Sequence, residues 1–338
     1  MMRGLVLGAV LAAVTAQQAQ AQIRPDQAAF RALYKELVET NTTLSSGSCT
    51  LAAERLAARM KAAGYAEKDL TVFSTPEKPK EGGLVAILPG TSKKAKPILL
   101  LGHLDVVEAN RADWTRDPFT LIEEGGYFYA RGASDDKAQS AIWTDTLIRF
   151  RQEGFKPKRT IKLALTCGEE TTTAFNGAGW LAKNRRELID AEYALNEGGG
   201  GLVGPDGTRS VLSMQVGEKT VANFRLETTN PGGHSSMPRP DNAIYSLATA
   251  LNRVGRYEFP VQFSDTTRSF FSRLAPTLQP KMSGAVTALL ANPEDKAADA
   301  LASMDPTLHS TLRTTCVATM LDGGHAMNAL PQRARAEK

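Results

Sequence analysis

The chain has 338 residues, of which 42% are hydrophobic, 22% charged and 7% aromatic. These values are typical of soluble globular proteins, so they exclude a disordered chain, a collagen-like repeat and a small disulfide-rich scaffold. The length predicts about two domains. The net charge is only +4, and the short run of Lys93, Lys94 and Lys96 is typical of a solvated loop, so we expect no nucleic-acid partner.

The first 21 residues have the pattern of a signal peptide. Arg3 supplies a positive charge, the stretch from Gly4 to Val14 has no polar side chain, and Ala19-Gln20-Ala21 is a small-x-small cleavage site. The apolar stretch is shorter than the roughly 20 residues that span a bilayer. An apolar first helix is the alternative. We therefore expect an exported protein, periplasmic or secreted, that has no membrane contact after cleavage.

Three cysteines, Cys49, Cys167 and Cys316, lie far apart in the sequence. Their odd number and wide spacing indicate neither a disulfide framework nor a CxxC zinc pattern. Cys167 follows an apolar strand pattern, and we expect it to be packed there as a small apolar side chain.

Apolar periodicity in the first two thirds of the chain alternates between helix and strand. Continuous aliphatic runs are typical of strands that are buried on both faces, and their alternation with helices favours an α/β sheet covered on both sides. The predicted helices are 30–38, 53–63, 137–150 and 177–186, and the predicted strands are 70–73, 84–88, 98–101, 161–165 and 193–195.

The pattern changes after Met214. We expect an antiparallel strand over 220–228 with one solvated face, and a helix over 242–254. Several short helices follow in 255–311, then a strand over 314–321 and another from Ala329. This order predicts a small α+β second domain, and we place the domain boundaries at 22–217 and 218–338.

Polar side chains follow three of the predicted buried strands, and an acidic pair opens a predicted helix. Taken singly these patterns are weak, because an H-x-D triplet is usually a hydrogen-bonded pair and acidic residues commonly cap helices. Ligands of open α/β sheets bind outside the carboxyl ends of the strands. We therefore expect these residues to meet at one edge: His103, Asp105, Asp135, Glu169, Glu170 and Glu197.

One imidazole with several carboxylates is a donor set that suits zinc or a similar divalent ion at a catalytic site. The adjacent residues Glu169 and Glu170 would then divide the work. One would bind the metal, and the other would take a proton from the metal-activated water, whose pKa falls to about 7.

Six segments then resemble a known family, in its order and spacing. The sequence is similar to the co-catalytic dizinc peptidases that include carboxypeptidase S, glutamate carboxypeptidase, aminoacylase and succinyl-diaminopimelate desuccinylase, and its long 255–311 segment most resembles the carboxypeptidase S branch. The resemblance covers nearly all of the chain after the signal peptide. It implies an α/β zinc-peptidase catalytic domain, its sheet covered by helices, with an inserted α+β lid and dimerisation domain. The segments are LLLGHLDVV, RGASDDK, CGEE, NEGG, GGHSSMP and GGHAMNALP.

The resemblance implies a role for each residue of the acidic cluster. His103, Asp135 and Glu197 would bind one zinc ion, and Asp135 would bridge to a second zinc ion held by Glu170. Glu169 would be the general base. The peptide bond that follows Asp135 would be cis.

The resemblance also assigns residues around this cluster. Asp105 would accept a hydrogen bond from the far ring nitrogen of His103 and so fix its tautomer. His234 would reach the active site of the partner subunit of a homodimer and help to hold the oxyanion, although Gly-Gly-His-Ser-Ser taken alone is a plain turn. Asn328 would lie near the substrate. His325 would lie on a lid strand and bind no metal, and we expect His309 at the surface.

The resemblance stops before the family's pattern is complete. Family members finish the lid, return to the catalytic domain and supply a last histidine to the zinc ion held by Glu170, whereas this sequence ends at Lys338. We therefore expect a C-terminally truncated member whose second zinc site has only Asp135 and Glu170, too few ligands for a typical catalytic site.

The sequence thus predicts a zinc hydrolase of peptide or N-acyl amide bonds, with a carboxypeptidase or dipeptidase as the leading form. An aminoacylase acting on N-acyl amino acids is the alternative within the enzymes. An inactive, truncated metal-binding or dimerising relic is the alternative outside them. A pure peptide-binding protein is less favoured, because binding alone does not call for the Glu169–Glu170 pair beside ligand-type residues.

Overall fold

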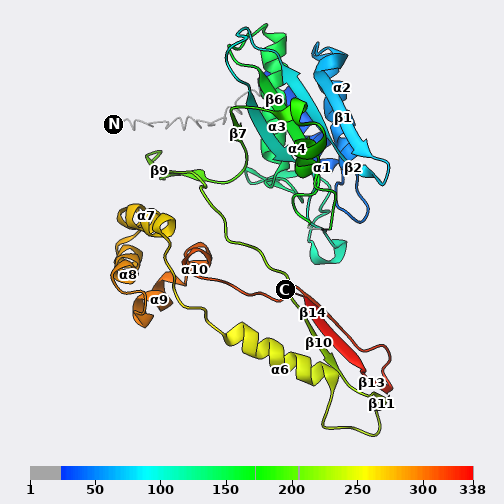
Figure 1. The fold of residues 1–338 in the computed structure, drawn as a ribbon, viewed down its shortest axis with the longest axis vertical. Helices are drawn as coiled ribbons and strands as arrows, with labels where there is room; N and C mark the ends of the chain where they lie inside the picture. The colour runs from blue at the N-terminus through cyan, green and yellow to red at the C-terminus, as the bar shows by residue number, and fades with distance from the viewer. Residues whose placement is uncertain (1–23, 172, 205, 338) are drawn as a thin grey trace, which may run out of the picture. The chain divides into compact units, whose positions relative to one another are not determined.

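The structure is a computed structural model, and it describes residues 24–171, 173–204 and 206–337. The expected signal peptide, residues 1–21, lies outside the described residues. The chain divides into two compact units, Met1–Glu197 (unit 1) and Gly198–Lys338 (unit 2) (Figure 1). No helix in the described part is long and apolar enough to span a bilayer.

Unit 1 is built on a five-stranded mixed sheet with the strand order β1-β2-β6-β3-β7 (Figure 1). The β1, β2 and β6 strands are antiparallel neighbours, whereas β6, β3 and β7 run parallel to one another. Because parallel strands end at the same edge, the residues that follow β3, β6 and β7 are brought together. The strands are β1 (Leu70–Thr75), β2 (Lys78–Leu88), β3 (Ile98–His103), β6 (Ile161–Thr166) and β7 (Tyr193–Leu195).

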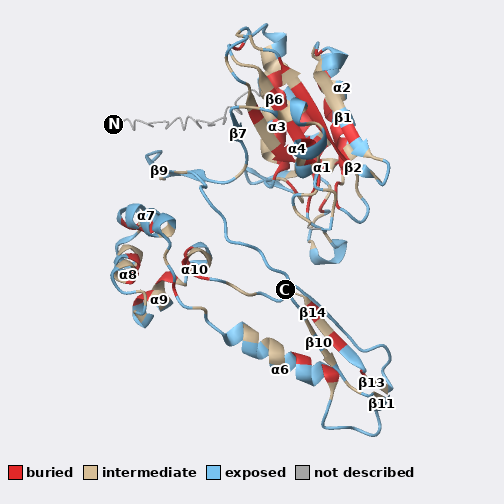
Figure 2. Cartoon of the chain, viewed as in Figure 1, coloured by how far each residue is buried: buried red, intermediate tan, exposed pale blue. Residues whose placement is uncertain are grey.

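Helices cover both faces of this sheet, as the sequence predicts. The α1 (Pro25–Glu39), α2 (Cys49–Ala62) and α3 (Lys137–Gln152) helices bury Leu37 and Leu56 against one face, together with Leu84 of β2. The α4 (Gly177–Asn184) and α5 (Arg186–Ile189) helices cover the other face, where Leu181 packs with Val85. Figure 2 shows the buried residues concentrated in these central strands.

Short elements complete unit 1. A single turn of 3-10 helix precedes β1, a second follows the loop after β3, and a small hairpin lies before α3. Their bounds are η1 (Glu67–Asp69), η2 (Arg111–Asp113), β4 (Ile122–Glu124) and β5 (Tyr127–Tyr129).

Unit 2 contains two small sheets, a hairpin and a set of short helices. The β14 strand lies between β10 and β12, and α6 packs on this sheet through Leu247 against Ala334 and Ala336. The α7 to α10 helices form a separate apolar cluster around Phe271 and Leu289. The strands are β8 (Gly200–Val203), β9 (Arg209–Ser213), β10 (Arg225–Thr229), β11 (Gly233–His234), β12 (Met320–Gly323), β13 (Ala329–Leu330) and β14 (Arg333–Glu337). The helices are α6 (Ala243–Arg256), α7 (Asp265–Leu274), η3 (Ala275–Thr277), α8 (Pro280–Ala291), α9 (Lys296–Ala302) and α10 (Pro306–Leu312).

Two predicted strands of unit 2 are wrong over most of their length. Of the stretch 220–228 only the part from Arg225 is strand, and of 314–321 only the part from Met320. Both strands begin where their pairing with β14 begins among the described residues, because Arg225 and Met320 both lie opposite Glu337. An alternating pattern predicts strand only where a partner is present.

The predicted burial of 193–195 is also wrong. Tyr193 and Leu195 are 48% and 50% exposed, because β7 is the edge strand of the sheet formed by the described residues, where it pairs with β3. Two of the three histidines of the second domain, His309 and His325, also differ from expectation. His325 lies in an exposed turn between β12 and β13 rather than on a strand, and His309 is half-buried in α10.

The expectation that the cysteines form no disulfide is wrong. Cys49 and Cys167 are bonded to each other across 118 residues of sequence, with their Cα atoms 6.0 Å apart, and Cys316 is free. Cys49 is the first residue of α2 and Cys167 directly follows β6. Their pairing follows from the packing of this helix on this sheet, which local spacing does not reveal.

Candidate metal centre

The predicted acidic cluster forms at the carboxyl edge of the parallel strands in unit 1. His103 is the last residue of β3, Glu169 and Glu170 follow β6, and Glu197 follows β7. Asp135 lies just before α3, and the Asp135–Asp136 peptide bond is cis, as expected.

The carboxylates converge on one ring nitrogen of His103. Its Nε2 atom lies 3.0 Å from Asp135 Oδ1, 3.4 Å from Glu197 Oε2 and 4.0 Å from Glu169 Oε2. Ligand atoms of His103, Asp135 and Glu170 lie within 4.8 Å of one another, and so do those of His103, Glu169 and Glu197. The structure therefore brings all five residues of the expected ligand and base set together.

The other ring nitrogen of His103 fixes the tautomer. Nδ1 lies 3.1 Å from the backbone oxygen of Asp105, and because a carbonyl oxygen only accepts, Nδ1 carries the proton. In the neutral ring the lone pair therefore lies on Nε2, where a metal ion can bind. The expected acceptor, the Asp105 carboxylate, is farther away, with Oδ1 at 3.6 Å.

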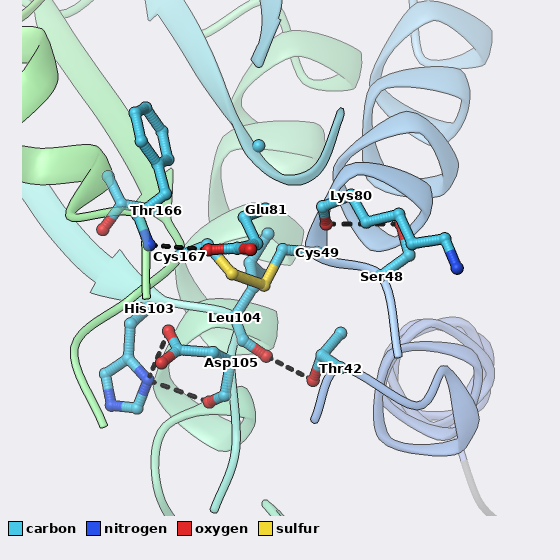
Figure 3. The surroundings of a disulfide bond; sticks show 12 residues. Thr42, Ser48, Cys49, Lys80, Glu81, His103, Leu104, Asp105, Thr166 and Cys167 are labelled. Atoms are coloured by element: carbon cyan, nitrogen blue, oxygen red, sulfur yellow. Dashed lines mark hydrogen bonds and ion pairs between the residues drawn. A yellow bond between two sulfur atoms is a disulfide. The ribbon is translucent and has the colours of Figure 1, made fainter. Parts of the chain in front are cut away.

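The Asp105 carboxylate has a second partner that the sequence does not reveal. Its Oδ2 atom accepts the backbone N–H of Glu170 at 3.0 Å, so this side chain links the end of β3 to the Glu169–Glu170 loop. Figure 3 shows the Asp105 carboxylate directed toward the His103 ring, next to the disulfide.

Burial and crowding shift the pKa values of these groups. Burial lowers the pKa of His103, but the surrounding carboxylates, Asp105 first among them, outweigh it and raise the value to about 10. Burial raises the pKa of Glu169 and of Glu170, and the neighbouring carboxylates raise both further. The cluster therefore carries like charges that repel one another.

This arrangement fits a divalent cation. Four carboxylates face one imidazole, and in the described part of the chain no lysine or arginine forms an ion pair with any of the four, Asp135, Glu169, Glu170 and Glu197. A cation would relieve this repulsion, and the nitrogen and oxygen donors are ones that zinc accepts.

The disulfide lies directly behind the cluster. The sulfur atoms of Cys49 and Cys167 and a carboxylate oxygen of Asp105 lie within 4.8 Å of one another, and all three residues are buried (Figure 3). The sulfur atoms are bonded to each other, so they are no metal ligands in this state. The bond ties the start of α2 to the residue before Gly168-Glu169-Glu170.

The two remaining predicted site residues, His234 and Asn328, lie together in unit 2. His234 pairs with Ala329 in the two-stranded sheet of β11 and β13, and the next residue, Ser235, donates its N–H to the backbone oxygen of Asn328 at 3.0 Å. His234 Nδ1 accepts the backbone N–H of Ser236 at 3.2 Å and lies 2.7 Å from the Ser236 hydroxyl. In the neutral ring the proton therefore lies on Nε2.

The chain is similar to known hydrolases over most of its length. It is 31% identical to a probable carboxypeptidase S-like 2 from Dictyostelium discoideum, over 73% of this chain and 48% of the relative. It is 28% identical to an N-fatty-acyl-amino acid synthase/hydrolase from Danio rerio, again over 73% of this chain and 48% of the relative. The chain thus spans about half the length of the curated relatives that it matches.

Solved structures share the fold at low sequence identity. A dipeptidase from Saccharomyces cerevisiae matches with a TM-score of 0.60 at 14% identity, covering 92% of this chain and 68% of that one. An M20 family metallo-carboxypeptidase from Sulfolobus solfataricus matches with a TM-score of 0.58 at 18% identity, covering 91% and 70%.

A family model that matches about two thirds of the chain identifies its family. Residues 99–321 match the profile of peptidase family M20/M25/M40, whose members are metal-dependent hydrolases, and this range contains the whole acidic cluster and His234. The chain therefore belongs to peptidase family M20/M25/M40.

Proposed function

We propose that this chain hydrolyses peptide bonds, as a carboxypeptidase or dipeptidase, with zinc bound at the acidic cluster of unit 1. The observation that carries the proposal is the gathering of four carboxylates around His103 at the carboxyl edge of the sheet, three of them within 4.0 Å of Nε2. A zinc ion, when bound, lowers the pKa of water and polarises the scissile carbonyl.

The ligand assignment follows the family resemblance. His103, Asp135 and Glu197 would hold one ion, and Asp135 would bridge to a second ion at Glu170. The short distances from Nε2 to Asp135 and Glu197, 3.0 and 3.4 Å, support the first of these sites. The Asp105–Glu170 hydrogen bond supports a fixed position for the residue of the second site.

Glu169 is our candidate for the general base. Its side chain is 52% exposed, so water and substrate can reach it, and burial of the remainder together with nearby carboxylates raises its pKa. A base whose pKa is raised toward neutrality accepts and returns a proton more effectively. Glu169 would take a proton from the attacking water and deliver it to the nitrogen of the leaving amine.

His234 is our candidate for the oxyanion donor. Its Nδ1 accepts from Ser236, so the neutral ring presents an N–H at Nε2, the group that a developing oxyanion requires. His234 is exposed in unit 2, and we propose that residues 218–338 form a lid and dimerisation domain that delivers His234 and Asn328 to an active site of a homodimer. Residues 22–217 would form the catalytic part.

We also propose that the protein is exported. The pattern of residues 1–21 supports export, and the Cys49–Cys167 disulfide supports it independently, because disulfides persist in oxidising compartments. Expression of the chain fused to a reporter that is active only outside the cytoplasm tests this proposal.

The second candidate function is hydrolysis of N-acyl amino acids. The relative from Danio rerio, named an N-fatty-acyl-amino acid synthase/hydrolase, favours it. A non-catalytic metal-binding protein is the third reading. Purified chain, stripped with a chelator and reloaded with zinc, would be assayed on dipeptides, longer peptides and N-acyl amino acids. Zinc-dependent cleavage of peptides supports the leading proposal, preference for acyl substrates supports the second, and metal binding without any turnover supports the third.

A further inference from the structure

The backbone of His103 has a strand neighbour on one side only. The β6 strand pairs with β3 up to His103, which lies opposite Thr166, whereas β7 pairs with β3 only as far as Leu100. Leu104 donates its backbone N–H to the backbone oxygen of Thr166 at 2.8 Å, so the backbone N–H of the residue after His103 points toward β6. Because backbone groups alternate along a strand, the N–H and C=O of His103 point away from β6, where no strand partner is found in the described residues.

Two side chains at the start of α3 occupy the place of the missing strand. Asp136 Oδ2 accepts a hydrogen bond from the backbone N–H of His103 at 3.1 Å. The Ser140 hydroxyl donates a hydrogen bond to the backbone oxygen of His103 at 3.2 Å. Ser140 also lies 3.4 Å from Asp136 Oδ2. His103 and Asp136 are each 3% exposed and Ser140 is 0% exposed, so water does not compete for these bonds.

The residue before His103 must be glycine for these side chains to approach. A Cβ atom on Gly102 would lie 2.8 Å from Asp136 Oδ2 and 2.9 Å from Ser140 Oγ. Both separations are too short for a real contact. Gly102, Asp136 and Ser140 therefore form one unit, which we call the His103 clamp.

We propose that Asp136 and Ser140 are positioning residues for metal binding: they hold the backbone of His103 so that Nε2 faces Asp135, Glu169 and Glu197. This inference rests on the proposed metal function of the cluster. His103 is the one nitrogen ligand of the set, and its ring direction follows from the backbone that carries it. Groups that orient a metal ligand typically contribute about 10- to 100-fold to metal affinity.

The clamp predicts an order among variants of Asp136. Asp136→Ala removes the acceptor and should weaken zinc binding about 10- to 100-fold. Asp136→Asn keeps an acceptor oxygen but removes the charge, and should stay within about threefold of the parent chain if the hydrogen bond is what matters. If only the charge of Asp136 mattered, Asp136→Ala and Asp136→Asn would weaken zinc binding equally.

Two further variants test the other parts of the clamp, each with a matched control. Ser140→Ala should weaken zinc binding about threefold to tenfold. Thr146→Ala removes a hydroxyl that donates to the backbone oxygen of Ile142 on the exposed side of the same helix, and zinc affinity should not change. Gly102→Ala should behave like Asp136→Ala, whereas Gly284→Ala in α8, where an added Cβ meets no atom within 4 Å, should bind zinc normally.

The readouts are the zinc dissociation constant of the full chain, measured against a competing chelator, and the visible absorption of the cobalt-loaded chain, which reports ligand geometry. Hydrogen exchange at the His103 amide in the metal-free chain should be faster in Asp136→Ala than in Asp136→Asn. Circular dichroism confirms folding of each variant. If the parent chain binds zinc and Asp136→Ala binds it equally well with an unchanged cobalt spectrum, the positioning role of the clamp is contradicted and the proposed function is not. If the parent chain binds no divalent metal, both are wrong.

Discussion

His103 and His234 differ in how the fold surrounds them. The His103 side chain is 4% exposed, its backbone is held by α3, and its two ring nitrogens face Asp105 and the carboxylate cluster. His234 is exposed, and the partner shown for its ring, Ser236, lies two residues further along the chain. A metal ligand has to be held in place before the ion arrives, whereas a donor to substrate has to remain accessible until the substrate arrives.

The same contrast holds for the elements that carry them. His103 ends an interior strand of a five-stranded sheet that is covered on both faces, while His234 lies on a two-residue strand paired with another two-residue strand. We infer that unit 1 holds the proposed metal ligands in fixed positions and that unit 2 presents the proposed substrate donor, His234, on a less constrained element. The predictions below test this difference.

The largest effect should come from exchanging the two histidines for alanine. His103→Ala removes the one imidazole of the cluster and should weaken zinc binding more than about 100-fold, beyond the effect of an orienting residue. His234→Ala should leave zinc affinity within about twofold and lower turnover instead, by about 100-fold, the effect of one lost oxyanion donor. Calorimetric zinc titration and steady-state kinetics of both variants check this. Equal loss of zinc in the two variants would contradict the assigned contrast.

Removal of the disulfide should affect unit 1 alone. The double variant Cys49→Ala, Cys167→Ala should lower the free energy of unfolding of unit 1 by about 2–4 kcal/mol, because a 118-residue loop is no longer closed in the unfolded chain. All three tryptophans, Trp114, Trp143 and Trp180, lie in unit 1, so their fluorescence during urea unfolding reports this unit.

Cys316→Ala is the matched control for that experiment, because Cys316 is the free cysteine of unit 2. It should leave the fluorescence transition unchanged. A double variant that unfolds at the same urea concentration as the parent chain would show that the bond does not stabilise unit 1.

Zinc affinity should depend on pH through His103. Its pKa is raised to about 10 in the metal-free chain, so near neutral pH a zinc ion has to displace a proton from the ring. The apparent affinity should therefore rise about tenfold per pH unit between pH 6 and pH 9 and level off near pH 10. Competition titrations in buffers of equal ionic strength check the slope. A flat profile over this range would mean that the ring is already neutral.

The smallest effect should come from the residue that sets the His234 tautomer. Ser236→Ala removes the hydroxyl but keeps the backbone N–H that also bonds Nδ1, so turnover should fall only about two- to tenfold, with zinc affinity unchanged. Ser235→Ala, on the neighbouring hydroxyl, is the control. A pH profile of turnover that shifts in Ser236→Ala and not in Ser235→Ala would support a tautomeric role, and an unchanged profile in both would oppose it.

The strands and helices of unit 1 could be predicted because continuous aliphatic runs and helical periodicity agree with the burial that tertiary packing imposes. Ile98–His103 and Ile161–Thr166 are both strands as expected, and the residues that follow them meet at one edge. The strands of unit 2 are harder to predict, because 220–228 alternates throughout whereas its pairing with β14 begins, in the described residues, only at Arg225.

The cluster around His103 could be predicted because ordered motifs place its members at strand ends. The contacts that hold the cluster in place could not be predicted. The Cys49–Cys167 bond joins residues 118 apart, and the Asp136 and Ser140 contacts depend on where α3 sits beside β3. The two consecutive residues Asp135 and Asp136 look alike in a sequence, yet the first carboxylate faces the cluster and the second faces a backbone amide. Only the turn of the backbone between them separates these roles.

The central claim, a metal-dependent hydrolase with Glu169 as its base, is tested most directly by Glu169→Gln. Glutamine keeps the shape of the side chain and removes its ability to accept a proton. We predict that the zinc-loaded variant binds zinc within about threefold of the parent chain and loses turnover of the best peptide or N-acyl substrate by at least about 100-fold. Turnover equal to that of the parent chain, at equal zinc content, would contradict the claim.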